Sequence, residues 1–450
     1  MSDIPRLALA IPGSSLEPSP ACLALLAGLT VATSRIQHFR TRACPLAGEW
    51  VTRATGIPGR HLDSWLMPPA VARRIFCKGA RNAHLAIIEG TLDEPESFVC
   101  SRRRQSPGDL RPIATVLDAP IVAVVPCNSI GRFHLPRRPE RVDAVILDGL
   151  SSTEDYEKLS RLVRLAWHTP VLGAVEALPE VRAAMEDAAG DEPPPTQAIA
   201  LLAHSFLKFA DTNAILQLAA SRPFPAIESE SPVKPGRPFR VAYAQDEAFG
   251  FYFPDTLEAL EELGAELLDF SPLRDGALPS NIDLVMIGCG MPDQFARELS
   301  SNVSMTTALR SHVCQGRRIY SEGGGTAYLG RTMHLLDGEV LGAGILPIEA
   351  ELQPNPAPPV PVERALTRDS WVGPRGTRVR GYLSGRWILT PTPDTLACPG
   401  SFGSLTEQDD IAFRKHAVGG MMHLHLGALD KVVASFAGRT ATGSPLLRDK

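Results

Sequence analysis

The sequence has no apolar run long enough to cross a bilayer, because its longest apolar stretches fall short of the ~18–20 residues that a membrane span needs. It also has no excess of basic residues: 45 Lys and Arg stand against 50 Asp and Glu, a formal net charge of −5. A nucleic-acid-binding surface therefore has no electrostatic support, and we expect neither a membrane nor a nucleic-acid partner. The first residues lack the basic start and small-residue exit of a signal peptide, so we expect a cytoplasmic protein.

Cysteine pairs of the CxxC type are also absent. The eight cysteines are scattered along the chain, which argues against a zinc ribbon and against a disulfide framework. We expect most of them to be small buried residues and predict no metal site. Proline, by contrast, is abundant: 40 prolines in 450 residues is about 9%, against an average of about 5%. The composition indicates a folded chain with many turns.

Short apolar runs alternate with helical patterns in the first half of the chain. The predicted strands cover 7–11, 84–88, 120–125, 144–147 and 170–173, and the predicted helices include 20–33, 68–78 and 154–167. Strands that are apolar throughout and alternate with helices are typical of a parallel α/β sheet.

The same alternation begins again after a segment rich in Pro, Ser and Glu. Its predicted strands are 239–244, 266–270, 283–288 and 318–321, and its predicted helices are 255–263 and 292–313. A chain of 450 residues favours two domains. We therefore predict domains over 1–222 and 238–450, joined by a Pro-rich linker over 223–237.

The most informative stretch is a predicted strand that ends at Glu322, Gly323 and Gly324 and leads into a helix. A strand, a sharp turn and a helix form the geometry of a nucleophile elbow, but the residue at the apex, Gly323, has no side chain. The turn with Gly288 and Gly290 is placed to form an oxyanion hole, and His423 is placed to supply a general base. The base and the oxyanion turn are thus present without a nucleophile.

The second half of the chain resembles the glutamine amidotransferase domain of cobyrinate (or hydrogenobyrinate) a,c-diamide synthase. Five stretches are similar to the family's AFxFYYP, FSPLxD, GGGYPE, YAECGG and HLHF segments: residues 248–254, 270–275, 288–293, 320–325 and 423–426. The resemblance implies a class I glutamine amidotransferase-like (flavodoxin-like) sheet.

The first half is similar to the ATP-using synthetase domain of the same family, a P-loop domain of the dethiobiotin-synthetase-like group. Residues 54–67 match the stretch after its nucleotide loop, 87–90 resemble its metal-proximal VIEG and 144–148 resemble its GVILN. The resemblance covers nearly the whole chain and implies a two-domain α/β protein that forms dimers.

The chain departs from the family at the elbow. In the family the elbow residue is a Cys whose thiolate attacks the carboxamide of glutamine, and here it is Gly323. We expect neither Cys289, on the oxyanion-side turn, nor Cys314, on the preceding helix, to replace this thiol. His423 and Glu322 are then interpreted as structural residues, and we predict no glutaminase activity.

The nucleotide loop departs from the family as well. Residues 12–20 align with the P-loop and keep Gly13, Ser14, Ser15 and Ser19 as its remnant, but Glu17 stands at the last glycine. Pro18 replaces the lysine and Pro20 the second threonine, which deletes two N–H donors and the ammonium that phosphates need. We therefore predict no normal ATP binding. Glu89, a Mg²⁺ position if nucleotide were bound, is expected to be a solvated residue at a strand end.

Three functions remain open. The first is a non-catalytic, cobyrinate a,c-diamide synthase-like protein without a cofactor, which binds a tetrapyrrole or corrinoid ligand and acts as a regulatory or scaffolding partner. It would form a homodimer or a heteromer with an active paralogue. The second is an ATP- and Mg²⁺-dependent amide ligase that uses free ammonia on a corrinoid or related carboxylate. The third is a protein that shares the fold but no role in the corrin pathway.

Overall fold

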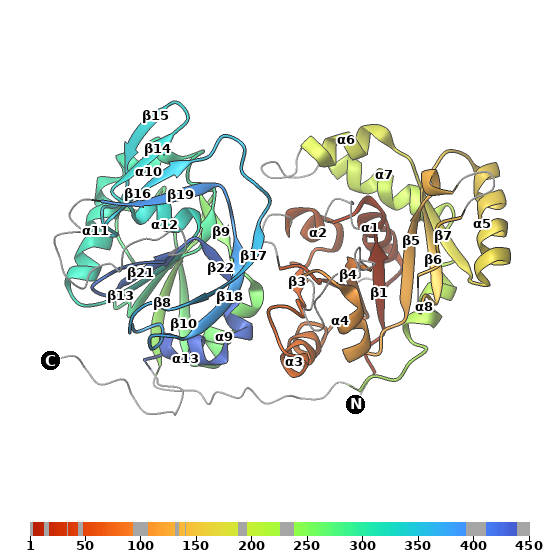
Figure 1. Cartoon of the computed structure of the whole chain (residues 1–450), viewed down its shortest axis with the longest axis horizontal. Coiled ribbons are helices and arrows are strands. Elements are labelled where there is room, and N and C mark those ends of the chain that lie inside the picture. The colour runs from red at the N-terminus through yellow and green to blue at the C-terminus, as the bar shows by residue number, and fades with distance from the viewer. Residues whose placement is uncertain are drawn as a thin grey trace, which may run out of the picture. The chain divides into compact units, whose positions relative to one another are not determined.

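The structure is a computed structural model that describes residues 3–12, 18–33, 35–43, 48–92, 107–130, 135–139, 141–187, 196–225, 238–392 and 411–438. The chain divides into two compact units, Met1–Glu230 and Ser231–Lys450. In Figure 1 the first unit runs from red to yellow-green and the second from green to blue. Both units contain a sheet with helices, the α/β class expected from the sequence.

The N-terminal unit has a seven-stranded sheet with the order β3-β2-β4-β1-β5-β6-β7, in which all pairings are parallel. Its strands are β1 (Arg6–Ile11), β2 (Ile36–Arg40), β3 (Arg60–His61), β4 (Leu85–Thr91), β5 (Ile121–Pro126), β6 (Ala144–Leu150) and β7 (Val171–Glu176). The helices are α1 (Pro20–Thr33), α2 (Gly48–Thr55), α3 (Pro69–Gly79), α4 (Leu110–Val116), α5 (Thr153–Trp167), α6 (Pro179–Asp187), α7 (Thr196–Leu207) and α8 (Thr212–Ala219), with a short 3₁₀ turn η2 (Cys127–Ser129).

Helix α1 lies at the centre of this unit. Its residues are apolar on every side, so the helix is buried from Pro20 to Leu29. It packs against α7, where a β-carbon added to Gly28 would come within 2.8 Å of the Phe206 ring. The start of α1 faces the C-terminal end of β4, which brings Ser19 next to Glu89.

The C-terminal unit has a six-stranded sheet with the order β10-β8-β11-β13-β21-β20, parallel except for the β20–β21 pair. Its strands are β8 (Phe239–Ala244), β10 (Ala265–Phe270), β11 (Leu284–Ile287), β13 (Arg318–Glu322), β20 (Ile411–Arg414) and β21 (Ala417–Gly420). Both faces of this sheet are covered: Val241 of β8 enters one apolar cluster, and its neighbour Ala242 enters another.

Smaller sheets and short helices complete this unit. The smaller sheets pair β12 with β9, β15-β14-β16-β19 and β17-β18-β22. Their strands are β9 (Phe249–Phe251), β12 (Cys289–Gly290), β14 (Thr332–Leu335), β15 (Gly338–Leu341), β16 (Ile348–Leu352), β17 (Val360–Ala365), β18 (Arg378–Leu383), β19 (Trp387–Pro391) and β22 (Met422–Leu424). The helices are α9 (Pro254–Glu262), α10 (Ala296–Ser301), α11 (Val303–Cys314), α12 (Gly324–Leu329) and α13 (Asp430–Phe436), with a 3₁₀ turn η4 (Leu426–Ala428).

One predicted helix of this unit is divided. The helix expected over 292–313 is two helices, α10 and α11, which meet at Asn302. The Asn302 side chain accepts a hydrogen bond from the Met305 N–H at 3.1 Å and caps the second helix. Among the described residues, no helix combines the length and apolarity needed to cross a bilayer.

Candidate functional site

The candidate site lies where three neighbouring parallel strands of the C-terminal unit end. Strands β11, β13 and β21 are adjacent and point the same way, so their C-terminal ends meet at one edge of the sheet. The turn with Gly288 follows β11, Gly323 follows β13, and His423 lies on β22 just after β21. The topology therefore brings together the residues that the sequence places in three separate motifs.

The turn at Gly323 has the strand–turn–helix form expected from the sequence. Gly323 has φ 51° and ψ −122°, a left-handed backbone region that favours glycine, and α12 begins at the next residue. The Gly323 N–H donates to the Gly420 carbonyl at 2.8 Å. Gly324 is held against the neighbouring turn, because an added β-carbon would lie 2.6 Å from the Gly290 carbonyl oxygen. The elbow backbone is thus complete without a nucleophilic side chain.

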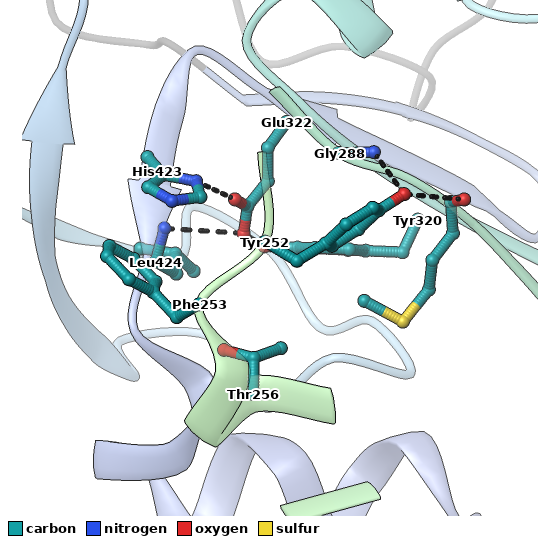
Figure 2. Close-up of a pocket in the computed structure, with 9 residues that line it drawn as sticks. Tyr252, Phe253, Thr256, Gly288, Tyr320, Glu322, His423 and Leu424 are labelled. Carbon is teal, nitrogen blue, oxygen red and sulfur yellow. Dashed lines mark hydrogen bonds and ion pairs between the residues drawn. The ribbon is translucent and has the colours of Figure 1, made fainter. Parts of the chain in front are cut away.

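Glu322 and His423 form a buried pair next to this turn. The Glu322 Oε2 lies 2.6 Å from the Nδ1 of His423, and both side chains are at least nine-tenths buried. The other carboxylate oxygen, Oε1, accepts hydrogen bonds from the Tyr320 hydroxyl at 2.6 Å and from the Leu424 N–H at 3.3 Å. Figure 2 shows the carboxylate between these partners. Burial and the nearby Glu322 carboxylate raise the pKa of Tyr320, so its hydroxyl remains a donor.

Cys289, at the start of β12, also contacts His423 of this pair. Its Sγ lies 3.2 Å from the Nδ1 of His423, the same nitrogen that contacts Glu322. A β-carbon added to Gly323 would lie 2.8 Å from this sulfur. Sequence reasoning placed Cys289 on the oxyanion side and missed its contact with the base. One signal was available in the aligned motifs: Cys289 stands where the family has glycine, and Gly323 stands where the family has cysteine.

The turn expected to form an oxyanion hole has its first N–H engaged. The Gly288 N–H donates to the Tyr252 hydroxyl at 2.8 Å, and that hydroxyl donates to the Met286 carbonyl at 3.2 Å (Figure 2). Gly290 is pressed against Ala248, so that an added β-carbon would overlap the Ala248 carbonyl. Tyr252 was not identified from the sequence, and burial raises its pKa.

The Phe253 ring packs against two histidine rings of residues 423–426. Its ring centroid lies 4.2 Å from that of His423 and 4.7 Å from that of His425. The Nε2 of His423 is buried and makes no hydrogen bond within the described part of the chain. The ring of His423 is therefore held by stacking and by its Nδ1 contacts, and it lines a small pocket with Tyr252 and Thr256.

The nucleotide-loop remnant is only partly described. Gly13, Ser14 and Ser15 lie outside the described residues, whereas Ser19 is buried at the start of α1. The Ser19 N–H donates to the Glu89 Oε1 at 2.8 Å, and the Ser19 Oγ accepts from the Cys22 N–H at 3.1 Å. The expectation that Glu89 is solvated is wrong: it is 2% exposed because β4 is a central strand.

Glu89 has a second partner that the sequence did not indicate. The His38 Nε2 lies 3.3 Å from the Glu89 Oε2, and both side chains are buried. Burial raises the pKa of Glu89, but the hydrogen bond from His38 and the charge of Arg40 outweigh it, so the net shift is downward. Burial lowers the pKa of His38, against the opposing effect of the Glu89 carboxylate. Glu89 is therefore an internal anion at the start of α1.

Comparison with known proteins identifies the family of this chain. Residues 240–427 match the model of the CobB/CobQ-like glutamine amidotransferase domain. The chain is 30% identical over 392 residues to the cobyrinate a,c-diamide synthase of Syntrophotalea carbinolica, covering 84% of this chain and 85% of the relative. It is 28% identical to the cobyrinate a,c-diamide synthase of Dehalococcoides mccartyi, covering 96% and 98% of the two chains. The hydrogenobyrinate a,c-diamide synthase of Streptomyces coelicolor is 27% identical, with 98% of each chain covered. The chain belongs to the cobyrinate/hydrogenobyrinate a,c-diamide synthase family.

Proposed function

We propose that this chain is a non-catalytic member of its family, a tetrapyrrole-binding protein that acts as a regulatory or scaffolding partner in a cobalamin-type pathway. The observation that carries the proposal is Gly323, the elbow residue without a side chain. Hydrolysis of glutamine by this type of site needs a nucleophile that forms an acyl intermediate. Removing an essential nucleophile costs about 10⁴–10⁶ in rate.

The position of Cys289 supports the proposal. A thiol and an imidazole form an activated pair when one ring nitrogen takes the thiol proton and the other is held by an acid. Here the Cys289 Sγ and the Glu322 Oε2 both contact Nδ1, at 3.2 and 2.6 Å. The nitrogen next to the thiol is thus already bonded to the carboxylate, and no relay through the ring is formed.

The N-terminal unit supports the proposal that no nucleotide cofactor is used. A phosphate binds at a helix start through backbone N–H groups and the positive end of the helix. In this chain the Glu89 carboxylate accepts the Ser19 N–H, and Pro20 at the first position of α1 has no N–H. An internal carboxylate thus competes with any phosphate, which disfavours the alternative of an ATP-dependent, ammonia-using ligase.

The names of the relatives support a proposal for the ligand of this chain. The relatives are named for cobyrinate and hydrogenobyrinate, and we propose a corrinoid or related tetrapyrrole carboxylate as the ligand of this chain. We propose further that it acts as a homodimer or in a complex with an active paralogue. A family member that keeps the fold but has no catalytic activity can change the activity of an enzyme partner. It does so by binding that partner or by binding the partner's substrate.

The proposal is tested by incubating the full chain with cobyrinate, Mg-ATP and either glutamine or ammonium. We expect the absorption spectrum of cobyrinate to change on binding, with no released glutamate and no amidated product. The synthase of Salmonella typhimurium, 29% identical to this chain, is a suitable active control. Glutamate release would overturn the loss of glutaminase, and amidation with ammonium would establish the alternative ligase.

A further inference from the structure

Three side chains of the kinds that bind metals converge at the elbow. Cys289 comes from the short strand β12 just after β11, Glu322 from the end of β13, and His423 from β22. Their ligand atoms, Sγ, a carboxylate oxygen and Nδ1, all lie within 4.8 Å of one another. His423, more than 100 positions beyond the other two residues in the sequence, thus meets a thiol and a carboxylate at one point.

We propose that Cys289, Glu322 and His423 bind one divalent transition-metal ion of the zinc class. Both the sulfur and the carboxylate oxygen face the same nitrogen of His423, rather than its two different nitrogens. Three electron-pair donors directed at one point repel each other unless a proton or a cation lies between them. A metal ion relieves this repulsion for all three groups at once. The proposal does not depend on the ligand proposed above.

The surroundings of Glu322 orient it as a metal ligand. The Tyr320 hydroxyl and the Leu424 N–H both bond Oε1, which leaves Oε2 directed at the cluster. Such hydrogen bonds behind a ligand are typical of metal sites, where they set the orientation of the coordinating atom. In the part of the chain that the structure describes, Glu322 forms an ion pair with no Lys or Arg. A bound cation would supply the missing positive charge.

Glycine at the elbow is what admits the sulfur. A β-carbon on residue 323 would lie 2.8 Å from the Cys289 Sγ, which is closer than real β-carbons approach. The exchange of cysteine and glycine between the two turns therefore moves the thiol from the elbow to a place beside Nδ1. This move joins the sulfur to a histidine and a carboxylate that are already hydrogen-bonded.

The ligand set indicates the class of metal. A thiolate, an imidazole and a carboxylate suit Zn²⁺, which binds sulfur at about 2.3 Å and nitrogen or oxygen at about 2.0–2.2 Å. Tetrahedral binding then separates sulfur from nitrogen by about 3.5 Å and nitrogen from oxygen by about 3.3 Å. The separations here are 3.2 and 2.6 Å, so the cluster must open by less than 1 Å. Three protein ligands leave the fourth position for water or a small ligand.

A second cluster of the same residue types lies in the N-terminal unit but is a weaker candidate. Cys22, His38 and Glu89 are also close together, and all three are buried. Glu89 already accepts the Ser19 N–H and lies in the field of Arg40, so its charge is compensated without a metal. Cys289, by contrast, is partly exposed and accessible to an incoming ion.

The test is the uptake of Co²⁺ and Zn²⁺ by the full chain after treatment with a chelator. We expect one equivalent of Co²⁺ with a sulfur-to-cobalt charge-transfer band, which Zn²⁺ removes by displacement. Cys289→Ser should abolish the band and weaken affinity at least about 100-fold, and Tyr320→Phe should weaken it about 10-fold with the band retained. Cys314→Ser, a change at an exposed and remote cysteine, is the matched control and should bind as the unmodified chain does.

Other outcomes would overturn the proposal. A band that survives in Cys289→Ser, or one that is lost in Cys22→Ser, would place the metal elsewhere. Alkylation of Cys289 by iodoacetamide provides a second readout, since a bound metal should slow it. Equal alkylation with and without Zn²⁺, or covalent labelling of Cys289 by a glutamine-like electrophile, would show a free nucleophilic thiol instead. None of these measurements uses glutamine or a tetrapyrrole, so they fail or succeed independently of the proposed function.

Discussion

The sulfur of Cys289 lies 2.8 Å from the point that a β-carbon of residue 323 would occupy. The two positions are therefore coupled, and a side chain at one excludes the present sulfur at the other. Glycine at position 323 and cysteine at position 289 are therefore best regarded as one structural feature.

This coupling predicts that Gly323→Cys alone does not create a working elbow. The single variant must displace the Cys289 sulfur, and we expect it to lower the free energy of unfolding by about 1–3 kcal/mol. The double variant Gly323→Cys/Cys289→Gly removes the clash and places a thiol on the turn next to His423. We expect glutamate release from glutamine in the double variant only. Equal release from the single variant would contradict the coupling, and Cys314→Ser is the control.

A second prediction concerns nucleotide. Because Glu89 accepts the N–H of Ser19, we expect calorimetry of the full chain with Mg-ATP to show no binding at micromolar concentrations. Glu89→Gln should weaken the contacts to Ser19 and His38 and cost about 1–3 kcal/mol of stability. Denaturant unfolding measures this loss. A magnesium-dependent heat of binding in the unmodified chain would refute the prediction.

A third prediction concerns the pH dependence of stability. His312 on α11 is buried with its Nε2 3.1 Å from the Arg318 carbonyl oxygen. Burial, aided by the charge of Arg317, lowers the pKa of His312 from 6.5 to about 4. Between these two values the unfolded chain binds a proton that the folded chain does not, so stability is full above pH 6.5 and falls toward pH 4.

The measurement is the urea midpoint at pH 7.5 and at pH 5. His312→Gln should reduce the loss of stability between the two values, and His204→Gln, at an exposed position of α7, should leave the loss unchanged. An unchanged loss in His312→Gln would show that another group is responsible.

A fourth prediction concerns Arg6, whose side chain is fully buried in the N-terminal unit. Its guanidinium donates to the carbonyls of Leu117, Asp118 and Arg222, at 2.6, 2.8 and 2.9 Å. These hydrogen bonds connect β1 to the segment at 117–118 and to residue 222. Burial lowers the pKa of Arg6 to about 10. Arg6→Met leaves these carbonyls without a donor and should cost about 3 kcal/mol or more.

The exposed Arg161→Met, in the same unit, is the control and should change stability by less than about 0.5 kcal/mol. Thermal unfolding of both variants gives the comparison. A similar small effect for Arg6→Met would mean that the carbonyls find other partners.

Elements with a simple apolar pattern could be predicted from the sequence with their bounds. Helix α1 and strand β8 begin and end where their patterns do, at 20–33 and 239–244. Strand β2 is different, because Gln37, His38 and Arg40 interrupt its apolar pattern. All three residues are buried; His38 contacts Glu89, and the Gln37 amide donates to the Pro58 carbonyl at 3.0 Å. A buried polar strand of this kind is recognised only once its partners are known.

The site divides in the same way. Local motifs predict three of its parts: the elbow, the turn after β11 and residues 423–426. The sheet brings these parts together. Two contacts, of Cys289 with His423 and of His38 with Glu89, join residues more than 50 positions apart. Residue spacing in the sequence does not predict contacts at such separations. The error on Glu89 has the same origin, since its burial comes from the neighbours of β4.

The bond between Ser19 and Glu89 has a consequence for the behaviour of the N-terminal unit in a cell. A domain whose fold is completed by a ligand becomes more stable as the ligand concentration rises. In this unit the anion at the start of α1 is the Glu89 carboxylate, which belongs to the chain itself. Its effective concentration at this site is therefore fixed. The melting temperature of the unit should therefore not respond to the adenylate level. On the proposed function, the unit would then offer its partner the same surface whether the cell is starved or well supplied with energy.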